Sequence, residues 1–239
     1  MEAVNLKLLV SIKSLAEAEK IKEADFDILD IKNPAEGSLG ANYPGVIKSI
    51  REQYSEFPVS AAGGDLPGQS GIASQVSFAL ASLKVDYLKL GLYGFKNIES
   101  AVLMLKEAKK AIKLSGNNVK LIAAAYADYE ENNTINPMFL NEIAFKTDID
   151  GIMIDTLNKS GKNLFSFLKA DDLKRFVKQA KKEKVFSALA GSLKSEDLPI
   201  LREINPDIIG FRGAVCENKD RTAAISSVKI NSLYQKINK

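Results

Sequence analysis

Histidine is absent from the 239 residues of this chain, and cysteine occurs once, at Cys216. Without histidine the chain lacks the usual general base and the commonest transition-metal ligand, so we expect no metal site. Acid–base chemistry then falls to lysine, aspartate, glutamate or tyrosine. Because a single cysteine cannot form an internal disulfide, the composition favours a reducing, cytoplasmic location.

Long apolar runs are also absent. No stretch approaches the roughly 18 to 20 residues that a helix needs to span a bilayer, and the apolar run within residues 1–14 is too short for a signal peptide. The formal net charge is only +3, and no basic stripe with interleaved aromatic residues appears. We therefore expect neither a membrane nor a nucleic acid as a partner.

Eight short β-rich runs alternate with segments that have helical periodicity, such as the apolar positions Ile98, Ala101, Val102, Leu105 and Ala108. Eight βα units are what a closed barrel requires, whereas an open doubly wound sheet usually has five or six strands. We predict one (β/α)8 TIM barrel over residues 1–239, with no domain boundary. The runs are Leu6–Ile12, Asp27–Lys32, Pro58–Gly64, Tyr87–Tyr93, Val119–Ala127, Gly151–Thr156, Val185–Ser192 and Asp207–Cys216.

Charged residues follow several of these strands, at the barrel end where catalytic residues project. Asp30 and Lys32 share a face by the two-residue period of a strand; Lys89 lies in the fourth strand, and Asp155 ends the sixth, just before Lys159. Burial and neighbouring ammonium groups lower the pKa of a lysine and so favour the free amine that imine formation needs. The cluster predicts Schiff-base chemistry. The alternative is that Asp30 and Lys32 form a structural ion pair while Lys89 faces solvent.

The ends of the last two strands predict a phosphate site. Gly191 and Ser192 precede a helix, and Gly210, Arg212 and Gly213 close the eighth strand, where barrels commonly bind phosphate through backbone N–H groups. Glycine lets the backbone approach an anion closely, and arginine adds charge-assisted hydrogen bonds. Glycines after strands are common, however, so this pattern alone also fits ordinary turns.

The segment that follows the third strand is ambiguous. Residues 64–71 contain three glycines and Asp65. This composition fits either a turn or a lid over the site, and both interpretations stay open.

The segment 30–42, DIKNPAEGSLGAN, closely resembles the (5-formylfuran-3-yl)methyl phosphate synthase family, also called 4-(hydroxymethyl)-2-furancarboxaldehyde-phosphate synthases, of methanofuran biosynthesis. Similar segments occur at Tyr87–Tyr93, at Gly151–Thr156 with Lys159, and at Gly210–Cys216, so the resemblance covers essentially the whole chain. One departure is Ile12, where the family pattern has proline after the serine.

The resemblance implies a (β/α)8 barrel lyase that condenses two molecules of glyceraldehyde 3-phosphate into a phosphorylated furan aldehyde, with loss of phosphate and water and without a cofactor. It also implies roles for individual residues. Lys32 matches the Schiff-base lysine, Lys89 the acid–base lysine, and Asp30, Asp155 and Lys159 the supporting charged residues.

Two other functions remain open: a class I aldolase acting on another sugar phosphate, and a non-catalytic barrel that serves as a binding subunit. A homo-oligomer is possible. Two substrate phosphates would need two anion subsites, and for the second one Lys159 and the loop Ser38–Asn42 are both candidates.

Overall fold

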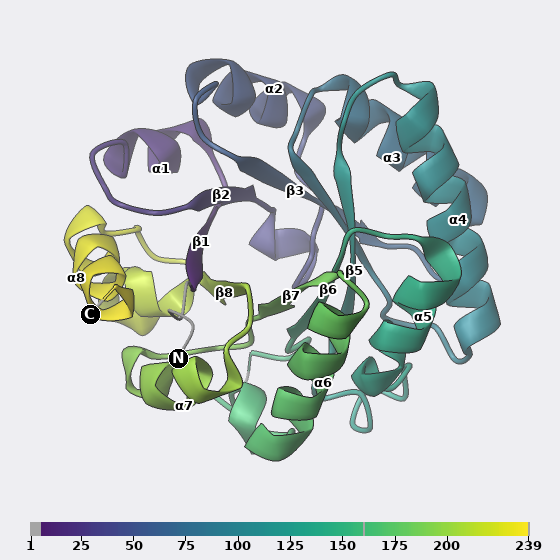
Figure 1. Cartoon of the computed structure of the whole chain (residues 1–239). Coiled ribbons are helices and arrows are strands. Elements are labelled where there is room, and N and C mark those ends of the chain that lie inside the picture. Colours follow the sequence, from purple (N-terminus) through teal and green to yellow (C-terminus); the bar gives the residue numbers. More distant parts are fainter. Residues whose placement is uncertain (1–5, 160, 239) are drawn as a thin grey trace.

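The computed structural model describes residues 6–159 and 161–238, and within them eight parallel strands close into a barrel surrounded by helices (Figure 1). Each strand pairs with the next in sequence, and β8 pairs with β1. This arrangement confirms the predicted (β/α)8 barrel. Residues 1–5 lie outside the described part, as do 160 and 239. The expectation that the apolar run within residues 1–14 is too short for a signal peptide and the extent of the domain over 1–239 therefore stay predictions. The strands are β1 Lys7–Ile12, β2 Ile28–Ile31, β3 Val59–Asp65, β4 Tyr87–Gly91, β5 Lys120–Tyr126, β6 Gly151–Asp155, β7 Phe186–Leu189 and β8 Ile208–Phe211.

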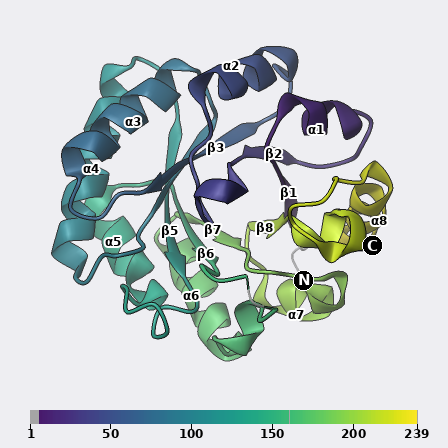
Figure 2. The same cartoon turned by 180° about the vertical axis from the view of Figure 1, so that it is seen from behind.

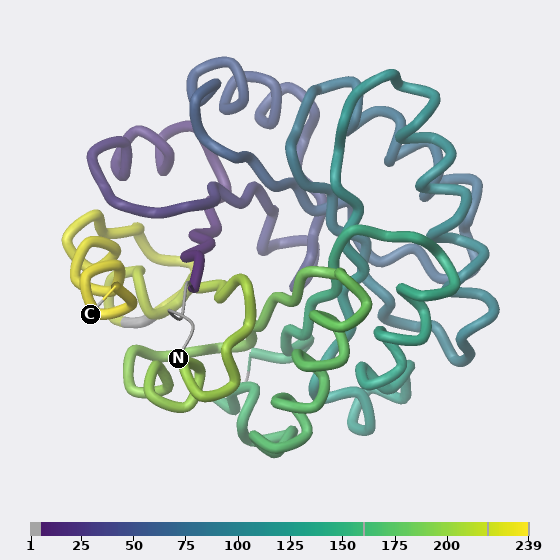
Figure 3. The backbone as a smooth tube through the Cα atoms, in the orientation of Figure 1, coloured from purple at the N-terminus to yellow at the C-terminus, as the bar shows by residue number. Residues whose placement is uncertain are grey.

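The helices form an outer ring, which is seen from behind in Figure 2. In α4 the Asn97 side chain accepts a hydrogen bond from the Ser100 N–H at the first turn, and Ala101, Leu105 and Ala108 bury the predicted apolar face. The chain trace makes one circuit, so α8 comes to lie against β1 (Figure 3). None of the described helices is long and apolar enough to cross a membrane. The helices are α1 Leu15–Lys20, α2 Pro44–Gln53, α3 Ser70–Ser82, α4 Ile98–Leu114, α5 Leu140–Thr147, α6 Ala170–Lys182, α7 Leu198–Ile204 and α8 Ser227–Ile237.

Alternation along the strands separates two apolar cores. In β5 the residues Leu121, Ala123 and Ala125 belong to the large core between strands and helices, whereas Ile122, Ala124 and Tyr126 belong to a smaller core inside the barrel. The interior core also contains Leu39, which comes from the loop after β2 and is fully buried. The interior of the barrel is therefore a packed core.

The eighth strand is shorter than predicted. It ends at Phe211, because the backbone of Arg212 leaves the extended region (φ −134°, ψ −70°) and Gly213–Val215 forms a 3-10 helix, η5. A second 3-10 helix, η6, follows at Glu217–Lys219. The segment after β8 is thus a structured loop at the mouth of the barrel.

Candidate active site

A cavity of about 390 Å³ lies at the carboxyl ends of the strands. Its lining comes from β1, β2, β6 and β8 and from the segments that follow β2, β6, β7 and β8. Lys89 alone among the predicted site residues is not one of the described lining residues. The predicted site residues that line the cavity are Asp30, Lys32, Asp155, Lys159, Gly191, Ser192, Gly210, Arg212 and Gly213.

Lys32 carries its side chain into this cavity. Its backbone N–H donates to the Ile12 carbonyl at 3.0 Å, which continues the β1–β2 pairing and holds the residue at the rim. The side chain is 7% exposed, and no described residue forms a hydrogen bond or ion pair with Nζ. Burial lowers the pKa of Lys32 to about 8, against the opposing charges of Asp155 and Asp30. An unpaired amine with this pKa is suited to nucleophilic attack.

Asp30 joins Lys89 in a buried ion pair. Lys89 Nζ lies 2.6 Å from Asp30 Oδ1, both side chains are 1% exposed, and Ser11 Oγ donates to Asp30 Oδ2 at 2.8 Å. Burial would raise the pKa of Asp30, but the positive charges of Lys89 and Lys32 lower it below its usual value. Both parts of the alternative are therefore wrong: Lys89 does not face solvent, and Asp30 pairs with Lys89 instead of Lys32.

Asp155 is held on the opposite side of the barrel. Its Oδ1 accepts hydrogen bonds from Lys159 Nζ at 2.8 Å and from the Thr156 N–H at 2.7 Å. Burial would raise the pKa of Asp155, but Lys159 and Lys32 hold it far below its usual range. Asp155 is thus a fixed negative charge that faces Lys32.

The loop after β2 reaches across the mouth to Asp155. Ser38 Oγ lies 2.9 Å from the Thr156 carbonyl oxygen and 3.2 Å from Asp155 Oδ2. Gly40 allows the loop to close on itself, since a Cβ there would lie 2.2 Å from the Asn33 carbonyl oxygen. The Ser38 hydroxyl is therefore already engaged by protein atoms, which weakens the case for this loop as a phosphate subsite.

Asp65 itself is the last residue of β3, and the residues after it form the predicted turn, since the Gln69 N–H donates to the Leu66 carbonyl oxygen at 3.1 Å. Its carboxylate accepts hydrogen bonds from Tyr126 Oη at 2.9 and 2.8 Å and from the Tyr93 N–H at 3.0 Å. Gly91 makes this approach possible, since a Cβ there would lie 1.9 Å from Asp65 Oδ1. Burial raises the pKa of Asp65. These residues are not among the described lining of the cavity.

The loop after β7 presents backbone N–H groups at the cavity. Gly191 and Ser192 both have positive φ angles, 108° and 52°, and no described residue accepts a hydrogen bond from either backbone N–H. A Cβ at Gly191 would lie 2.9 Å from Thr156 Cγ2, so glycine also serves close packing. Two free N–H groups beside a cavity are suited to binding an anion.

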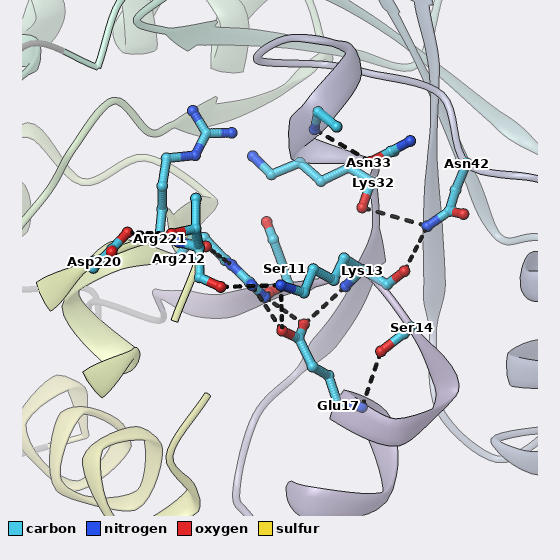
Figure 4. A network of polar contacts seen from close by, with 12 residues as sticks. Ser11, Lys13, Ser14, Glu17, Lys32, Asn33, Asn42, Arg212, Asp220 and Arg221 are labelled. Carbon is cyan, nitrogen blue, oxygen red and sulfur yellow. Dashed lines mark hydrogen bonds and ion pairs between the residues drawn. The ribbon is translucent and has the colours of Figure 1, made fainter. Parts of the chain in front are cut away.

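Arg212 is engaged by the protein itself. Its guanidinium makes a two-pronged ion pair with Glu17, at 2.6 and 2.9 Å, and donates to the carbonyl oxygens of Ser11 and Arg221, both at 2.9 Å (Figure 4). Burial would raise the pKa of Glu17, but its hydrogen bonds to Arg212 lower it. This geometry disfavours the predicted role of Arg212 as a phosphate clamp, although Arg212 lines the cavity.

Arg212→Ala should therefore lower stability. Removal of Arg212 leaves the buried Glu17 carboxylate with only Lys13 as an ion-pair partner among the described residues, at 3.8 Å from Lys13 Nζ to Glu17 Oε1, and we expect a loss of about 3–5 kcal/mol in the free energy of unfolding. Urea unfolding monitored by circular dichroism measures it. The matched control is Arg175→Ala, which breaks an exposed pair with Asp172 on α6 and should cost less than about 1 kcal/mol. Equal urea midpoints for Arg212→Ala and Arg175→Ala would contradict the structural role of Arg212.

Comparison of the sequence with known proteins identifies the family of this chain. The sequence model of the 4-HFC-P synthase family matches residues 8–234. The chain belongs to the 4-HFC-P synthase family. Curated relatives named (5-formylfuran-3-yl)methyl phosphate synthase include a protein of Methanococcus maripaludis strain C7, 44% identical over 215 residues that cover 90% of this chain and 91% of the relative. A Methanopyrus kandleri protein of the same name is 41% identical, with 96% and 98% covered. The family predicted from segment 30–42 is confirmed.

Solved structures similar to this 4-HFC-P synthase family member share its fold. KGPDC from Streptococcus mutans has a TM-score of 0.68 at 11% identity, with 97% of each chain covered. A 3-hexulose-6-phosphate synthase has a TM-score of 0.65 at 16% identity, with 97% of this chain and 100% of the other covered. At such identities the likeness supports the barrel architecture and carries no functional information.

Arg221 is missing from the sequence-based predictions of this family member's site, and Ser38 is predicted only as part of a candidate phosphate subsite, not as a partner of Asp155. Arg221 lines the cavity from the loop between η6 and α8, and Ser38 supports Asp155 from the loop after β2. Neither residue lies on a strand, so the two-residue period gives no information about where its side chain points. Segment 30–42 identifies Ser38 as part of a motif but does not reveal its contact with β6.

Proposed function

We propose that this protein is a lyase that condenses two molecules of glyceraldehyde 3-phosphate into 4-(hydroxymethyl)-2-furancarboxaldehyde phosphate, with loss of phosphate and water, in methanofuran biosynthesis. The observation that carries the proposal is the Lys32 amine, which is buried, lines the cavity and has no partner among the described residues. The names of the family relatives supply the product class.

Lys32 forms the covalent intermediate in this proposal. Its free amine adds to the carbonyl of one triose phosphate, and loss of water gives an imine. The iminium withdraws electrons from the adjacent carbon, so that a proton can leave that carbon, phosphate can be eliminated and a carbon–carbon bond can form with the second triose. Hydrolysis returns the amine, and dehydration to the aromatic ring drives the sequence forward.

The two buried ion pairs supply charge and protons. Lys89 Nζ lies 2.6 Å from Asp30 Oδ1, and Asp30 lines the cavity. We assign proton transfer to Lys89, with Asp30 lying between it and the substrate. Asp155 and Lys159 lie on the other side of the barrel. We assign to them the orientation and electrostatic stabilisation of the iminium at Lys32.

The loops after β7 and β8 bind phosphate in the proposal. Gly191 and Ser192 offer backbone N–H groups that have no acceptor among the described residues, and Gly210 and Gly213 line the same cavity. Backbone donors bind an anion in the ground state and in the transition state alike, so they contribute mainly to substrate binding.

Incubation with glyceraldehyde 3-phosphate tests the proposal directly. We expect release of inorganic phosphate together with a new furan absorbance. A class I aldolase would instead give a reversible condensation without phosphate release, and a binding subunit would leave the substrate unchanged. Either result would reject the furan synthase assignment.

The pKa of Lys32, which burial lowers to about 8, predicts the pH dependence of imine formation. Only the unprotonated amine attacks, so the initial rate of borohydride trapping should rise about tenfold per pH unit well below pH 8 and level off above it. An ordinary lysine would still gain rate near pH 10. Trapping rates measured between pH 6 and pH 10 check this expectation, and a rise that continues to pH 10 would contradict it.

A further inference from the structure

Arg221 lines the cavity and has a guanidinium nitrogen without a hydrogen-bond partner among the described residues. This nitrogen, the terminal Nη2, is buried. In Figure 4 the side chains of Arg221 and Lys32 extend into the same space. The function proposed above assigns no role to this residue.

A guanidinium in this position is costly without an anion. Burial lowers the pKa of Arg221, which means that its surroundings disfavour the charge that the side chain carries. No described carboxylate forms an ion pair with it. The neighbouring Asp220 is engaged elsewhere, since its Oδ1 accepts hydrogen bonds from the N–H and hydroxyl of Thr222, both at 2.8 Å. The Arg221 donors are therefore available to a ligand.

The backbone of Arg221 is held in place by a buried ion pair. Arg212 Nε donates to the Arg221 carbonyl oxygen at 2.9 Å, and Glu17 fixes the same guanidinium of Arg212. The next residue is also held, because Lys13, which directly follows β1, donates from Nζ to the Thr222 carbonyl oxygen at 3.0 Å. The loop thus presents Arg221 with little conformational freedom left to lose on binding.

Lys159 is a poorer candidate for the same task. A lysine ammonium has three donors, and Lys159 Nζ donates to Asp155 Oδ1, to the Thr156 carbonyl oxygen and to Thr156 Oγ1. Anion binding by Lys159 would break bonds that also hold Asp155. Arg221 can bind an anion without such a loss.

We propose that Arg221 binds the phosphate group of a triose phosphate in this cavity, together with the free N–H groups of Gly191 and Ser192. The planar guanidinium fork matches two phosphate oxygens, and the anion compensates the buried charge. This inference rests on the proposed function for the identity of the ligand. It replaces Arg212 by Arg221 as the phosphate ligand and makes Arg212 the positioning residue behind it.

Binding of glycerol 3-phosphate, measured by isothermal titration calorimetry, tests the proposal. This compound has the phosphate of the substrate but no carbonyl, so its binding does not depend on imine formation. Arg221→Ala should weaken binding about ten- to hundredfold, the range for loss of charge-assisted hydrogen bonds. The affinity of Arg221→Lys should lie between those of the parent protein and Arg221→Ala, because lysine keeps the positive charge but loses the planar guanidinium. The control Arg175→Ala removes the same charge from the exposed face of α6 and should bind as the parent does.

A second measurement separates phosphate recognition from folding. Trapping by borohydride should strongly prefer glyceraldehyde 3-phosphate over glyceraldehyde in the parent protein, and Arg221→Ala should reduce this preference while trapping of glyceraldehyde itself continues. Unchanged affinity for glycerol 3-phosphate in Arg221→Ala, or no binding by the parent protein, would overturn the inference. If the parent forms no furan product but binds glycerol 3-phosphate through Arg221, the proposed function fails and the anion site stands.

Discussion

Lys32→Arg should abolish both turnover and the adduct that borohydride traps with glyceraldehyde 3-phosphate. Arginine keeps the positive charge but cannot form the imine, so this variant separates a covalent role from an electrostatic one. We expect a loss of turnover of at least about 10⁴-fold, because the electron sink disappears altogether. Mass spectrometry of the reduced protein should find one adduct per chain, on Lys32 in the parent and on no residue in the variant.

The matched control is Lys174→Arg. Lys174 forms an exposed pair with Glu203 on the outside of the barrel, so the same chemical change there should leave turnover and trapping intact. An adduct on Lys89 or Lys159 in the parent protein would exchange the assigned roles. An active Lys32→Arg enzyme would remove the Schiff base from the mechanism.

The barrel could be predicted from sequence because its information is local. Each strand is a short apolar run, and the inward and outward faces of β5 alternate as the two-residue period requires. The same period places Asp30 and Lys32 at one cavity. The prediction was less accurate for β8. The composition of the residues after Phe211 fits a strand, but the backbone turns at Arg212 and forms η5.

Partners that are distant in sequence could not be predicted in this way. Arg212 looked like a phosphate ligand because it follows a strand between two glycines, and nothing local shows that Glu17, 195 residues away, occupies its guanidinium. The pairing of Asp30 with Lys89 depends on the closure of the barrel, which brings two strands to one interior face. Such pairings depend on which strands are close in the folded barrel and on how far the side chains reach. Neither is known when each strand is interpreted alone.

Lys89→Met should slow turnover by roughly 10²- to 10⁴-fold, the usual effect of removing a general acid–base group, while the Lys32 adduct can still be trapped. Methionine keeps much of the volume of the buried side chain but carries no proton. Turnover and trapping measured on the same preparation separate the two effects. Turnover equal to that of the parent would contradict the acid–base role, and loss of the adduct would show that Lys89 is needed for imine formation itself.

The pH profile of the same variant distinguishes electrostatic from acid–base effects. The positive charge of Lys89 helps to keep the pKa of Lys32 at about 8, so its removal should raise that pKa and move the plateau of trapping to higher pH.

Lys89→Met also leaves Asp30 buried and unpaired, at a cost of about 3–5 kcal/mol in the free energy of unfolding. The double variant Asp30→Asn with Lys89→Met should recover part of that stability, because no unpaired charge remains. It should not recover turnover, since the proton carried by Lys89 is still missing, and recovered turnover would show that the single variant was slow only because its site was damaged.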